Sequence, residues 1–301
     1  MTAFLARHER FDRVTSTNDV VRAWLAEGTP EVSLAVADEQ TAGRGREGRR
    51  WLAPPGSALL LSLGFRPSWL DPERVWRLAA VVSLAMADAA EEVAGLPDRA
   101  IRLKWPNDLV IELDGEPAVA LDAPADDGPA DDIPADDDPA DDSPAHVRKV
   151  AGVLGETDGL GTADPHVVVG LGINADWPAT DFPADLAASM TSLREASRGR
   201  RIDVAILLDA FLQRLEARVE TLRGGRFDVA DWSDRQLTTG RLIRLEQPEG
   251  MEIVRALGVE ATTGALIVAD PTAIGGERHV HVGEIRHVRL ADPIVVGGVT
   301  R

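Results

Sequence analysis

The order of apolar and polar residues predicts alternating strands and helices over most of the chain. Apolar runs bounded by Gly, Pro, Asn or Asp predict strands at residues 32–38, 57–65, 101–104, 109–113, 149–156 and 166–174. Two segments carry apolar residues three and four positions apart, which predicts long helices at about 71–93 and 203–222. This arrangement predicts an α+β fold in which helices flank a mixed sheet.

The pattern changes after about residue 236, where short alternating strands follow one another without helices. Strands are expected at 241–246, 252–260, 265–270 and 279–290, separated by P-E-G, T-T-G and G-G turns. Short strands of this kind predict a small β-barrel. We therefore divide the chain into a larger domain, residues 1–235, and a small C-terminal domain, residues 236–301.

An acidic repeat interrupts the larger domain at about residues 122–146. The unit P-A-D-D-x occurs four times from Pro124 to Ser143, with no aromatic residue and one β-branched residue, Ile133. Such a segment has too little apolar surface to offset its chain entropy, so we predict a disordered insert. Neutral repeat expansion and a modulatory acidic arm are both open explanations.

Composition narrows the class of protein. The 301 residues, 44% hydrophobic, can bury one large core and a small second one. The absence of cysteine excludes disulfides and Cys-based zinc sites. No segment has the apolar length of a membrane span or a signal peptide, so we expect a soluble, cytoplasmic protein without a membrane partner. The formal net charge of −18 argues against a nucleic-acid partner.

The candidate chemistry begins in the segment G-R-G-R-E-G-R-R-W, from Gly43 to Trp51. Glycine lets backbone N–H groups approach an anion closely, and guanidinium groups bind anions in a bidentate manner. The three glycines have the spacing G-x-G-x-x-G, but a dinucleotide-binding fingerprint must open a helix, and Pro54-Pro55 forbids one. The segment therefore predicts an anion-binding loop, with a solvated Arg/Gly turn as the alternative.

The chain contains only two lysines, Lys104 and Lys149, beside thirty arginines. This bias indicates that arginine would not serve at either position, because a compact ammonium enters a tight polar pocket that a planar guanidinium cannot. Trp105-Pro106 predicts an extended turn after Lys104, with Asn107 and Asp108 at its tip. An ordinary Asx-turn for this tip and a surface position for Lys149 are the alternatives.

Five motifs follow one another in a fixed order: S-T-N-D from Ser16, the loop from Gly43, K-W-P-N-D from Lys104, K-V-A-G-V-L-G-E from Lys149, and G-L-G-I-N from Gly170. Together they resemble the biotin protein ligases over about residues 11–175. The resemblance implies a class II synthetase/biotin ligase-like catalytic domain with an SH3-like C-terminal barrel, and it places the acidic insert at a hairpin tip. With ten residues before the matching region, it further implies a monofunctional ligase without an N-terminal DNA-binding domain.

The resemblance also assigns roles to individual residues. The expected biotin-binding residues are Ser16, Thr17, Asn18, Gln40, Arg44, Gly45, Arg46 and Lys149. The expected nucleotide-binding residues are Gly43, Arg46, Trp51, Asn107 and Asn174. Lys149, Arg46 and Asp108 are the expected catalytic residues, and Asp108 is also a candidate ligand for Mg²⁺. Ordinary structural roles stay open: helix capping for the S-T-N-D turn, strand-end amides for Gln40 and Asn174, and a core position for Trp51.

The reaction that the resemblance implies is ATP-dependent biotinylation. The biotin carboxylate attacks the α-phosphate of ATP to give biotinyl-5'-AMP, and a lysine of a biotin carboxyl carrier domain, in an acyl-CoA or pyruvate carboxylase, then attacks this anhydride. The implied cofactors are ATP, biotin and Mg²⁺, and a homodimer is compatible with the resemblance. Two alternatives are a lipoate or octanoate ligase or transferase of the same fold, and a non-enzymatic binding module.

Overall fold

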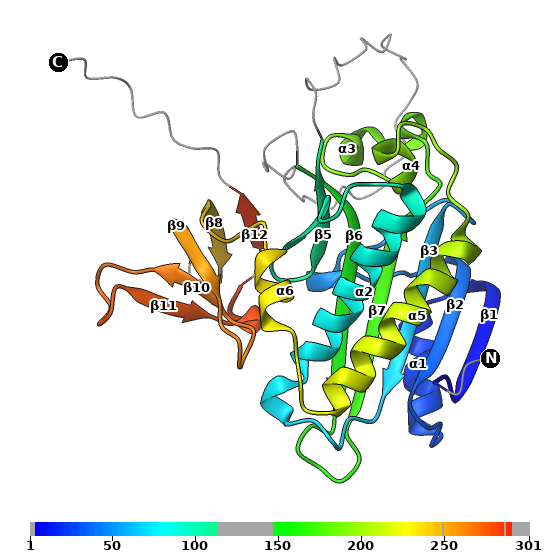
Figure 1. The fold of residues 1–301 in the computed structure, drawn as a ribbon, viewed down its shortest axis with the longest axis horizontal. Helices are drawn as coiled ribbons and strands as arrows, with labels where there is room; N and C mark the ends of the chain where they lie inside the picture. Colours follow the sequence, from blue (N-terminus) through cyan, green and yellow to red (C-terminus); the bar gives the residue numbers. More distant parts are fainter. Residues whose placement is uncertain (1–3, 114–146, 249, 286, 291–301) are drawn as a thin grey trace, which may run out of the picture.

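The computed structural model describes residues 4–113, 147–248, 250–285 and 287–290 (Figure 1). Within these residues a seven-stranded sheet runs in the order β1-β2-β3-β7-β6-β5-β4. Its strands are β1 Arg7–Val14, β2 Ser33–Gln40, β3 Ala58–Phe65, β4 Ile101–Lys104, β5 Asp108–Glu112, β6 Val147–Asp158 and β7 His166–Asn174. β1 and β2 are parallel and the other neighbours are antiparallel, so the predicted mixed sheet is confirmed.

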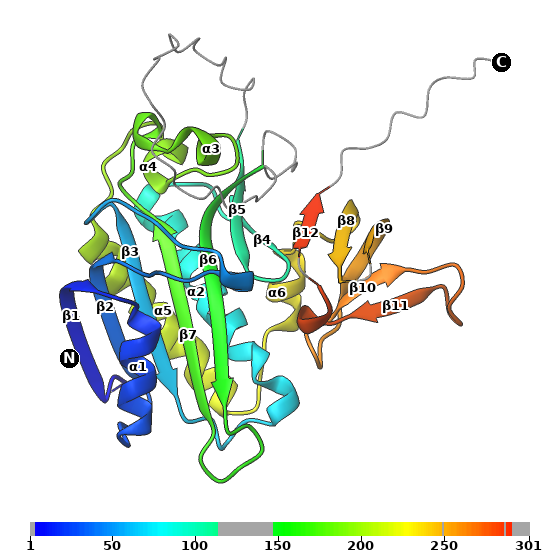
Figure 2. The same cartoon turned by 180° about the vertical axis from the view of Figure 1, so that it is seen from behind.

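Helices cover both faces of this sheet. The longer helices are α1 Thr17–Ala26, α2 Trp76–Ala94 and α5 Val204–Arg223, and the shorter ones are α3 Ala184–Ala187, α4 Leu193–Ala196 and α6 Val229–Asp234. Single 3-10 turns occur at Arg46–Gly48, Pro72–Arg74, Ala179–Asp181 and Val282–Glu284. α2 and α5 cover one face (Figure 1), and α1 covers the other, where it contacts β2, β3 and β7 (Figure 2).

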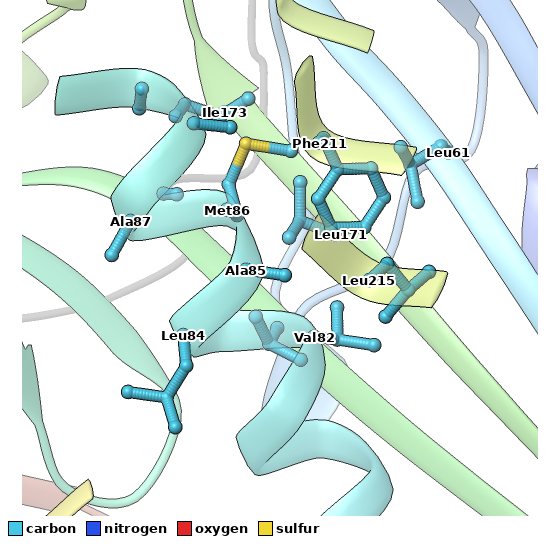
Figure 3. Packing of buried hydrophobic residues seen from close by; sticks show 14 of the residues in the cluster. Leu61, Val82, Leu84, Ala85, Met86, Ala87, Leu171, Ile173, Phe211 and Leu215 are labelled. Atoms are coloured by element: carbon cyan, nitrogen blue, oxygen red, sulfur yellow. The ribbon is translucent and has the colours of Figure 1, made fainter. Parts of the chain in front are cut away.

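α2 is buried on nearly all sides rather than along the single stripe that its apolar spacing predicts. Every residue from 80 to 87 is buried, because α2 packs against both the sheet and α5, which lies beside it on the same face. Figure 3 shows Met86 of α2 beside Phe211 of α5, with Leu171 and Ile173 of β7 close to them. The many alanines of α2 allow these neighbours to approach closely, which gives the domain one continuous core.

The C-terminal residues form a second, antiparallel sheet, consistent with a small barrel-like domain. Within the described residues its order is β11-β10-β9-β8-β12. The strands are β8 Leu242–Gln247, β9 Gly250–Val259, β10 Leu266–Ala269, β11 Glu277–Val280 and β12 His287–Leu290. The prediction of one continuous strand at 279–290 is wrong. β11 pairs with β10 and β12 with β8, at opposite edges of the sheet, so the chain must cross between them through a 3-10 turn.

The two sheets are connected through the edge strand β4 and through two tryptophans. Leu103 of β4 donates its N–H to the carbonyl of Arg235 and accepts one from Leu237. The indole of Trp105 donates to the carbonyl of Gly264 at 3.0 Å, and that of Trp76 donates to the β9–β10 turn. The C-terminal sheet is therefore held against the K-W-P-N-D segment, while the division of the chain at residue 235 remains our proposal.

The acidic insert predicted at about residues 122–146 lies outside the described residues. Its flanking strands are described: β5 and β6 pair up to Glu112 and Val147, which are direct partners. The insert therefore connects the neighbouring ends of an antiparallel hairpin. Across the parts of the chain that the structure describes, no helix is long and apolar enough to cross a membrane.

Candidate functional site

The candidate site lies on the sheet face that α2 and α5 leave uncovered. Gly170 and Gly172 of β7 and Gly152 of β6 give this face a stretch without side chains, and Gly152 pairs directly with Gly172. A Cβ on Gly170 would overlap the side chain of Asn18, and one on Gly172 would stand 2.6 Å from the ring of Trp51. The glycines therefore allow the S-T-N-D turn and the Arg/Gly loop to lie directly on the strands.

The S-T-N-D turn and Gln40 form a hydrogen-bonded polar cluster together with Ser62 of β3. We call Ser16, Thr17, Asn18, Gln40 and Ser62 the turn pocket, and all of these residues except the half-buried Gln40 are buried. Thr17 donates its backbone N–H to Gln40 Oε1 at 2.7 Å, and its hydroxyl lies 2.6 Å from Ser62 Oγ. Ser16 occupies the N-cap position of α1 but makes no side-chain capping hydrogen bond. The structure thus brings together the residues of the S-T-N-D turn and Gln40, which were predicted to bind biotin. Helix capping does not explain the role of the Ser16 hydroxyl.

Sequence analysis missed two polar residues of this region, Ser62 and Glu156. Ser62 Oγ donates to Asn18 Oδ1 at 2.5 Å, and Asn18 Nδ2 donates to Glu156 Oε2 at 2.9 Å. Ser62 is fully buried, and it is the one polar residue in the apolar run A-L-L-L-S-L-G-F. That interruption was the available signal, because a buried hydroxyl must find hydrogen-bond partners.

Arg44 of the loop lies beside the turn pocket but is paired with carboxylates. Its guanidinium donates to both oxygens of Asp19, at 2.9 and 2.8 Å, and lies 3.5 Å from Glu156. The hydrogen bond from Arg44 holds the pKa of Asp19 below its usual value, with Arg22 acting in the same direction. Arg44 is therefore positioned at the pocket entrance by Asp19, a residue to which the sequence analysis gave no role.

The Arg/Gly loop folds back on itself as a short hairpin. Trp51 donates its N–H to the carbonyl of Gly43 at 2.9 Å, and Gly45 donates to Arg49 at 2.7 Å. A Cβ on Gly43 would stand 2.6 Å from the carbonyl oxygen of Trp51, so only glycine fits this close approach. The segment contains a single 3-10 turn and opens no longer helix, in agreement with rejecting a dinucleotide-binding fingerprint. In Figure 2 the loop crosses the sheet from β2 towards β4.

The far end of the loop brings Trp51 to Lys149. The ring of Trp51 lies on Gly152 and Gly172, and Lys149 Nζ lies 5.4 Å from its centroid, within cation–π range. Lys149 Nζ also forms an ion pair with Asp108 Oδ1 at 2.7 Å. Trp51 therefore covers the site rather than joining the hydrophobic core.

Lys104, Asp108 and Lys149 form what we call the lysine cluster. Lys104 is buried, and it stands opposite Asp108 in the β4–β5 strand pairing. Burial alone would raise the pKa of Asp108, but Lys149 and Lys104 together hold it below its usual value. Both lysines of the protein thus act on one carboxylate, and the cluster keeps a net positive charge, which suits an anionic ligand.

Three residues that were predicted to bind the nucleotide donate side-chain hydrogen bonds to backbone carbonyls of the protein. Arg46 donates to the carbonyls of Val282 and Ile285 in the C-terminal domain, at 3.0 and 3.3 Å, and burial lowers its pKa. Asn107 Nδ2 donates to the carbonyl of Val153, and Asn174 Nδ2 to that of Thr191. The structure therefore places Arg46 at the junction with the C-terminal domain. It also gives each asparagine a structural hydrogen bond that was not predicted from the sequence.

The described residues contain no group of three or more His, Asp or Glu side chains that could hold a metal ion. Asp108 is a single carboxylate already paired with Lys149. Mg²⁺ commonly keeps several waters and binds through one or two carboxylates plus substrate phosphates. The residues present therefore fit a Mg²⁺ ion that arrives with a polyphosphate, rather than one held by the protein alone.

Comparison with known proteins adds independent information. The sequence profile of the Biotin/lipoate A/B protein ligase family matches residues 10–174. The bifunctional ligase/repressor BirA of Bacillus subtilis is 27% identical over 83% of this chain and 65% of its own length. The biotin--[acetyl-CoA-carboxylase] ligase of Mycobacterium tuberculosis is 29% identical over 79% of this chain and 74% of its own. The chain thus spans just under two thirds of the bifunctional relative.

A solved structure shares the fold over nearly the whole chain. It is that of the biotin protein ligase from Aquifex aeolicus in complex with biotin and ATP, with a TM-score of 0.67. The match has 23% sequence identity and covers 96% of this chain and all of that one. At this identity the likeness establishes the architecture, and the roles of individual residues must be argued from their geometry.

Proposed function

Because the chain belongs to the Biotin/lipoate A/B protein ligase family, we propose that it is an ATP-dependent biotin protein ligase. It would form biotinyl-5'-AMP and pyrophosphate from biotin and ATP, and then transfer biotin to a lysine of a carboxyl carrier domain. One observation carries this proposal. A neutral hydrogen-bonding pocket and a cationic cluster lie on the same glycine-lined sheet face, as a ligand with a polar ring at one end and a carboxylate at the other requires.

The turn pocket is the proposed site of the ureido ring. A cyclic urea offers two N–H donors and one carbonyl acceptor, and Ser16, Thr17 and Gln40 can supply groups of both kinds. The burial of Ser16 and Thr17 supports this assignment, since a hydrogen bond in a site shielded from water discriminates strongly between ligands. Asn18 would orient the turn, and Arg44 and Gly45 would close the pocket from the loop.

The lysine cluster is the proposed site of the first reaction step. That step brings a carboxylate against a polyphosphate, so neutralisation of charge and positioning supply most of the rate. Lys149 would contact both the biotin carboxylate and the α-phosphate, while Asp108 holds its ammonium in place. In the second step Asp108 could orient the incoming amine of the acceptor lysine.

The proposed nucleotide site extends from Trp51 towards the C-terminal domain. Gly43, Trp51, Asn107 and Asn174 are its proposed residues, with the indole covering the adenylate. Arg46 would contribute to this site only after leaving its two carbonyl acceptors at the domain junction. Mg²⁺ bound to the polyphosphate would screen its charge, with Asp108 as the candidate protein ligand.

The proposed partner is the biotin carboxyl carrier domain of an acyl-CoA or pyruvate carboxylase. A cleft of about 400 Å³ between α2, β6 and the C-terminal sheet reaches Lys104 and Asp108 from the α2 side of the large sheet, opposite the glycine-lined face. Homodimerisation stays a further proposal. A lipoate or octanoate ligase of the same fold is the competing function, and the polar turn pocket disfavours it because an acyl chain makes no ureido contacts.

The test is direct. The protein is incubated with ATP, Mg²⁺, a carrier domain and either biotin, lipoate or octanoate, and the carrier is analysed by mass spectrometry. We expect a mass increase with biotin alone, together with biotin-dependent pyrophosphate exchange. Modification by lipoate or octanoate in place of biotin would establish the competing function, and no exchange with any acid would leave only a binding module.

A further inference from the structure

Ser62 stands at the centre of a hydrogen-bond chain that runs from Glu156 to Thr17. It is fully buried, and its hydroxyl lies 2.5 Å from Asn18 Oδ1 and 2.6 Å from Thr17 Oγ1. We propose that Ser62, together with Glu156, is a positioning residue that forces the Thr17 hydroxyl to accept a hydrogen bond from the ligand. This inference rests on the proposed function, in which that ligand is the ureido ring of biotin.

The hydrogen-bond chain starts at the charged carboxylate of Glu156. Glu156 receives hydrogen bonds from Arg22 and Asn18, and Arg44 lies 3.5 Å away. A carboxylate in this setting can only accept hydrogen bonds, so the Asn18 amide must turn its NH₂ group towards Glu156. The amide oxygen of Asn18 then faces Ser62.

This orientation of Asn18 also determines where the hydroxyl protons of Ser62 and Thr17 point. Asn18 Oδ1 can only accept, so Ser62 must donate its single hydroxyl proton to it. Ser62 Oγ can then only accept from Thr17, and the separation of 2.6 Å agrees with a short O–H···O bond. The alternative acceptor of the Thr17 proton, Gln40 Oε1, is more distant at 3.1 Å.

The ligand therefore meets a pocket of defined polarity. Thr17 has given its proton to Ser62, so its oxygen offers lone pairs to an N–H donor. Gln40 Oε1 accepts the Thr17 backbone N–H at 2.7 Å, which leaves the NH₂ group of Gln40 as a donor. One acceptor beside one donor matches the adjacent N–H and C=O groups of a cyclic urea, and it disfavours ligands that lack the N–H.

The experiment compares biotin with its two lactam analogues, in each of which one ureido N–H is replaced by CH₂. Affinities are measured calorimetrically for wild type, Ser62→Ala and Glu156→Gln. Glutamine keeps the size of Glu156 but can donate as well as accept, so it no longer fixes the Asn18 amide. Ser33→Ala is the matched control, because Ser33 is also a fully buried strand serine and its hydroxyl has no hydrogen-bond partner within the described residues.

We expect wild type and Ser33→Ala to bind one of the two lactams at least about tenfold more weakly than biotin. In Ser62→Ala and Glu156→Gln, biotin should bind about tenfold more weakly and the biotin-to-lactam ratio should fall below about threefold, with the KM for ATP unchanged. If Ser62→Ala does not fold, Glu156→Gln carries the test alone.

Two results would overturn the inference while leaving the proposed function intact. In one, the variants lose affinity for biotin and both lactams by the same factor, which a purely structural role predicts. In the other, wild type does not distinguish biotin from either lactam. Failure of wild type to bind biotin at all would instead remove the proposed function, and this inference with it.

Discussion

The turn pocket and the lysine cluster lie on one sheet face but are built by different means. The turn pocket is neutral and largely buried, and the hydrogen bonds of residues in α1, β2 and β3 hold its side chains. The lysine cluster is charged, lies at the β4–β5 turn and the start of β6, and is covered by Trp51 from a loop. The first can recognise a ligand by the placement of its donors and acceptors. The second can recognise only charge and size.

This difference predicts that the two regions control different quantities, ligand affinity in one and reaction rate in the other. Directional hydrogen bonds in a preformed pocket set affinity and specificity, whereas charges beside a reacting carboxylate and phosphate set the rate of the chemical step. Changes in the turn pocket should therefore alter the Kd for biotin, and changes in the lysine cluster should alter the rate of adenylation. The following predictions test this separation.

The largest effect is expected at Lys149. Replacement by Ala removes charge-assisted hydrogen bonds worth roughly 1.5–3 kcal/mol each, so biotin-dependent pyrophosphate exchange should slow by about 10²- to 10⁴-fold. Replacement by Arg restores the charge but not the compact shape, and it should recover little of the rate. Biotin affinity without ATP should change much less than the rate.

Thermal melts are the control for Lys149: Lys149→Ala should stay folded and melt at most a few degrees below wild type, because it loses the ion pair with Asp108 but no core packing. Exchange by Lys149→Arg within threefold of wild type would mean that the cluster needs only positive charge. The scarcity of lysine in this chain would then have another cause.

The second effect is expected at Gly170, beneath the turn pocket. A Cβ at this position would overlap the Asn18 side chain, so Gly170→Ala must displace Asn18 and break its bonds to Ser62 and Glu156. Losing two or more hydrogen bonds should weaken biotin binding by about 10- to 100-fold, with little effect on the KM for ATP.

Gly155 provides the matched control for Gly170. It lies on the neighbouring strand β6, and a Cβ built on it meets no atom within 4 Å. Gly155→Ala should therefore bind biotin like wild type. An equal loss of affinity in both variants, or a loss confined to ATP in Gly170→Ala, would show that the two ends of the site are not independent.

Sequence analysis predicted the framework of both regions better than it predicted their side chains. The strands at 101–104 and 166–174 match β4 and β7, because Gly, Pro and Asn mark their ends. The strand expected at 279–290 failed, because nothing local records that β11 and β12 pair with opposite edges of a sheet. Long-range pairing of this kind is a property of the whole fold.

The site shows the same limit. The resemblance indicated Thr17, Gln40 and Lys149, but it gave no role to Ser62, Glu156 or Asp19, although the last two lie inside the quoted motifs. Arg46 is a further case: the motif assigns it to the ligand, which stays a prediction, while in the structure its guanidinium donates to carbonyls of the C-terminal domain. The sequence gives the chemical groups, but only the folded structure determines which of them come into contact.

A smaller, pH-dependent effect is expected at Asp108. Its pKa is lowered in the folded protein by Lys149 and Lys104 against the effect of burial. The ionised carboxylate therefore stabilises the fold fully above its unfolded pKa of about 3.9, and this contribution disappears as the pH falls through the lower folded value. Wild type should melt a few degrees above Asp108→Asn at pH 7, and the gap should close below about pH 4.

Melting curves of both proteins between pH 7 and pH 2.5 measure this gap. A difference that stays constant over the whole range would mean that the charge of Asp108 does not stabilise the folded state. The lysine cluster would then be assembled by packing, as the turn pocket is by hydrogen bonds, and the contrast between them would weaken.

The smallest effect is expected from excising Pro124 to Ser143, in the hairpin that joins β5 to β6. Glu112 and Val147 are direct partners in the ladder, so the remaining connection needs only to join two neighbouring strand ends. Shortening a long connection changes its closure entropy by less than about 1 kcal/mol. The lysine cluster takes Asp108 from β5 and Lys149 from β6, and both strands stay anchored by their neighbours β4 and β7. Exchange rates should therefore stay within about twofold of wild type. A change of tenfold or more in the apparent constant for ATP or Mg²⁺ would show that the insert's aspartates act on the charged end of the site, and an unchanged Kd for biotin would confine that action to the lysine cluster.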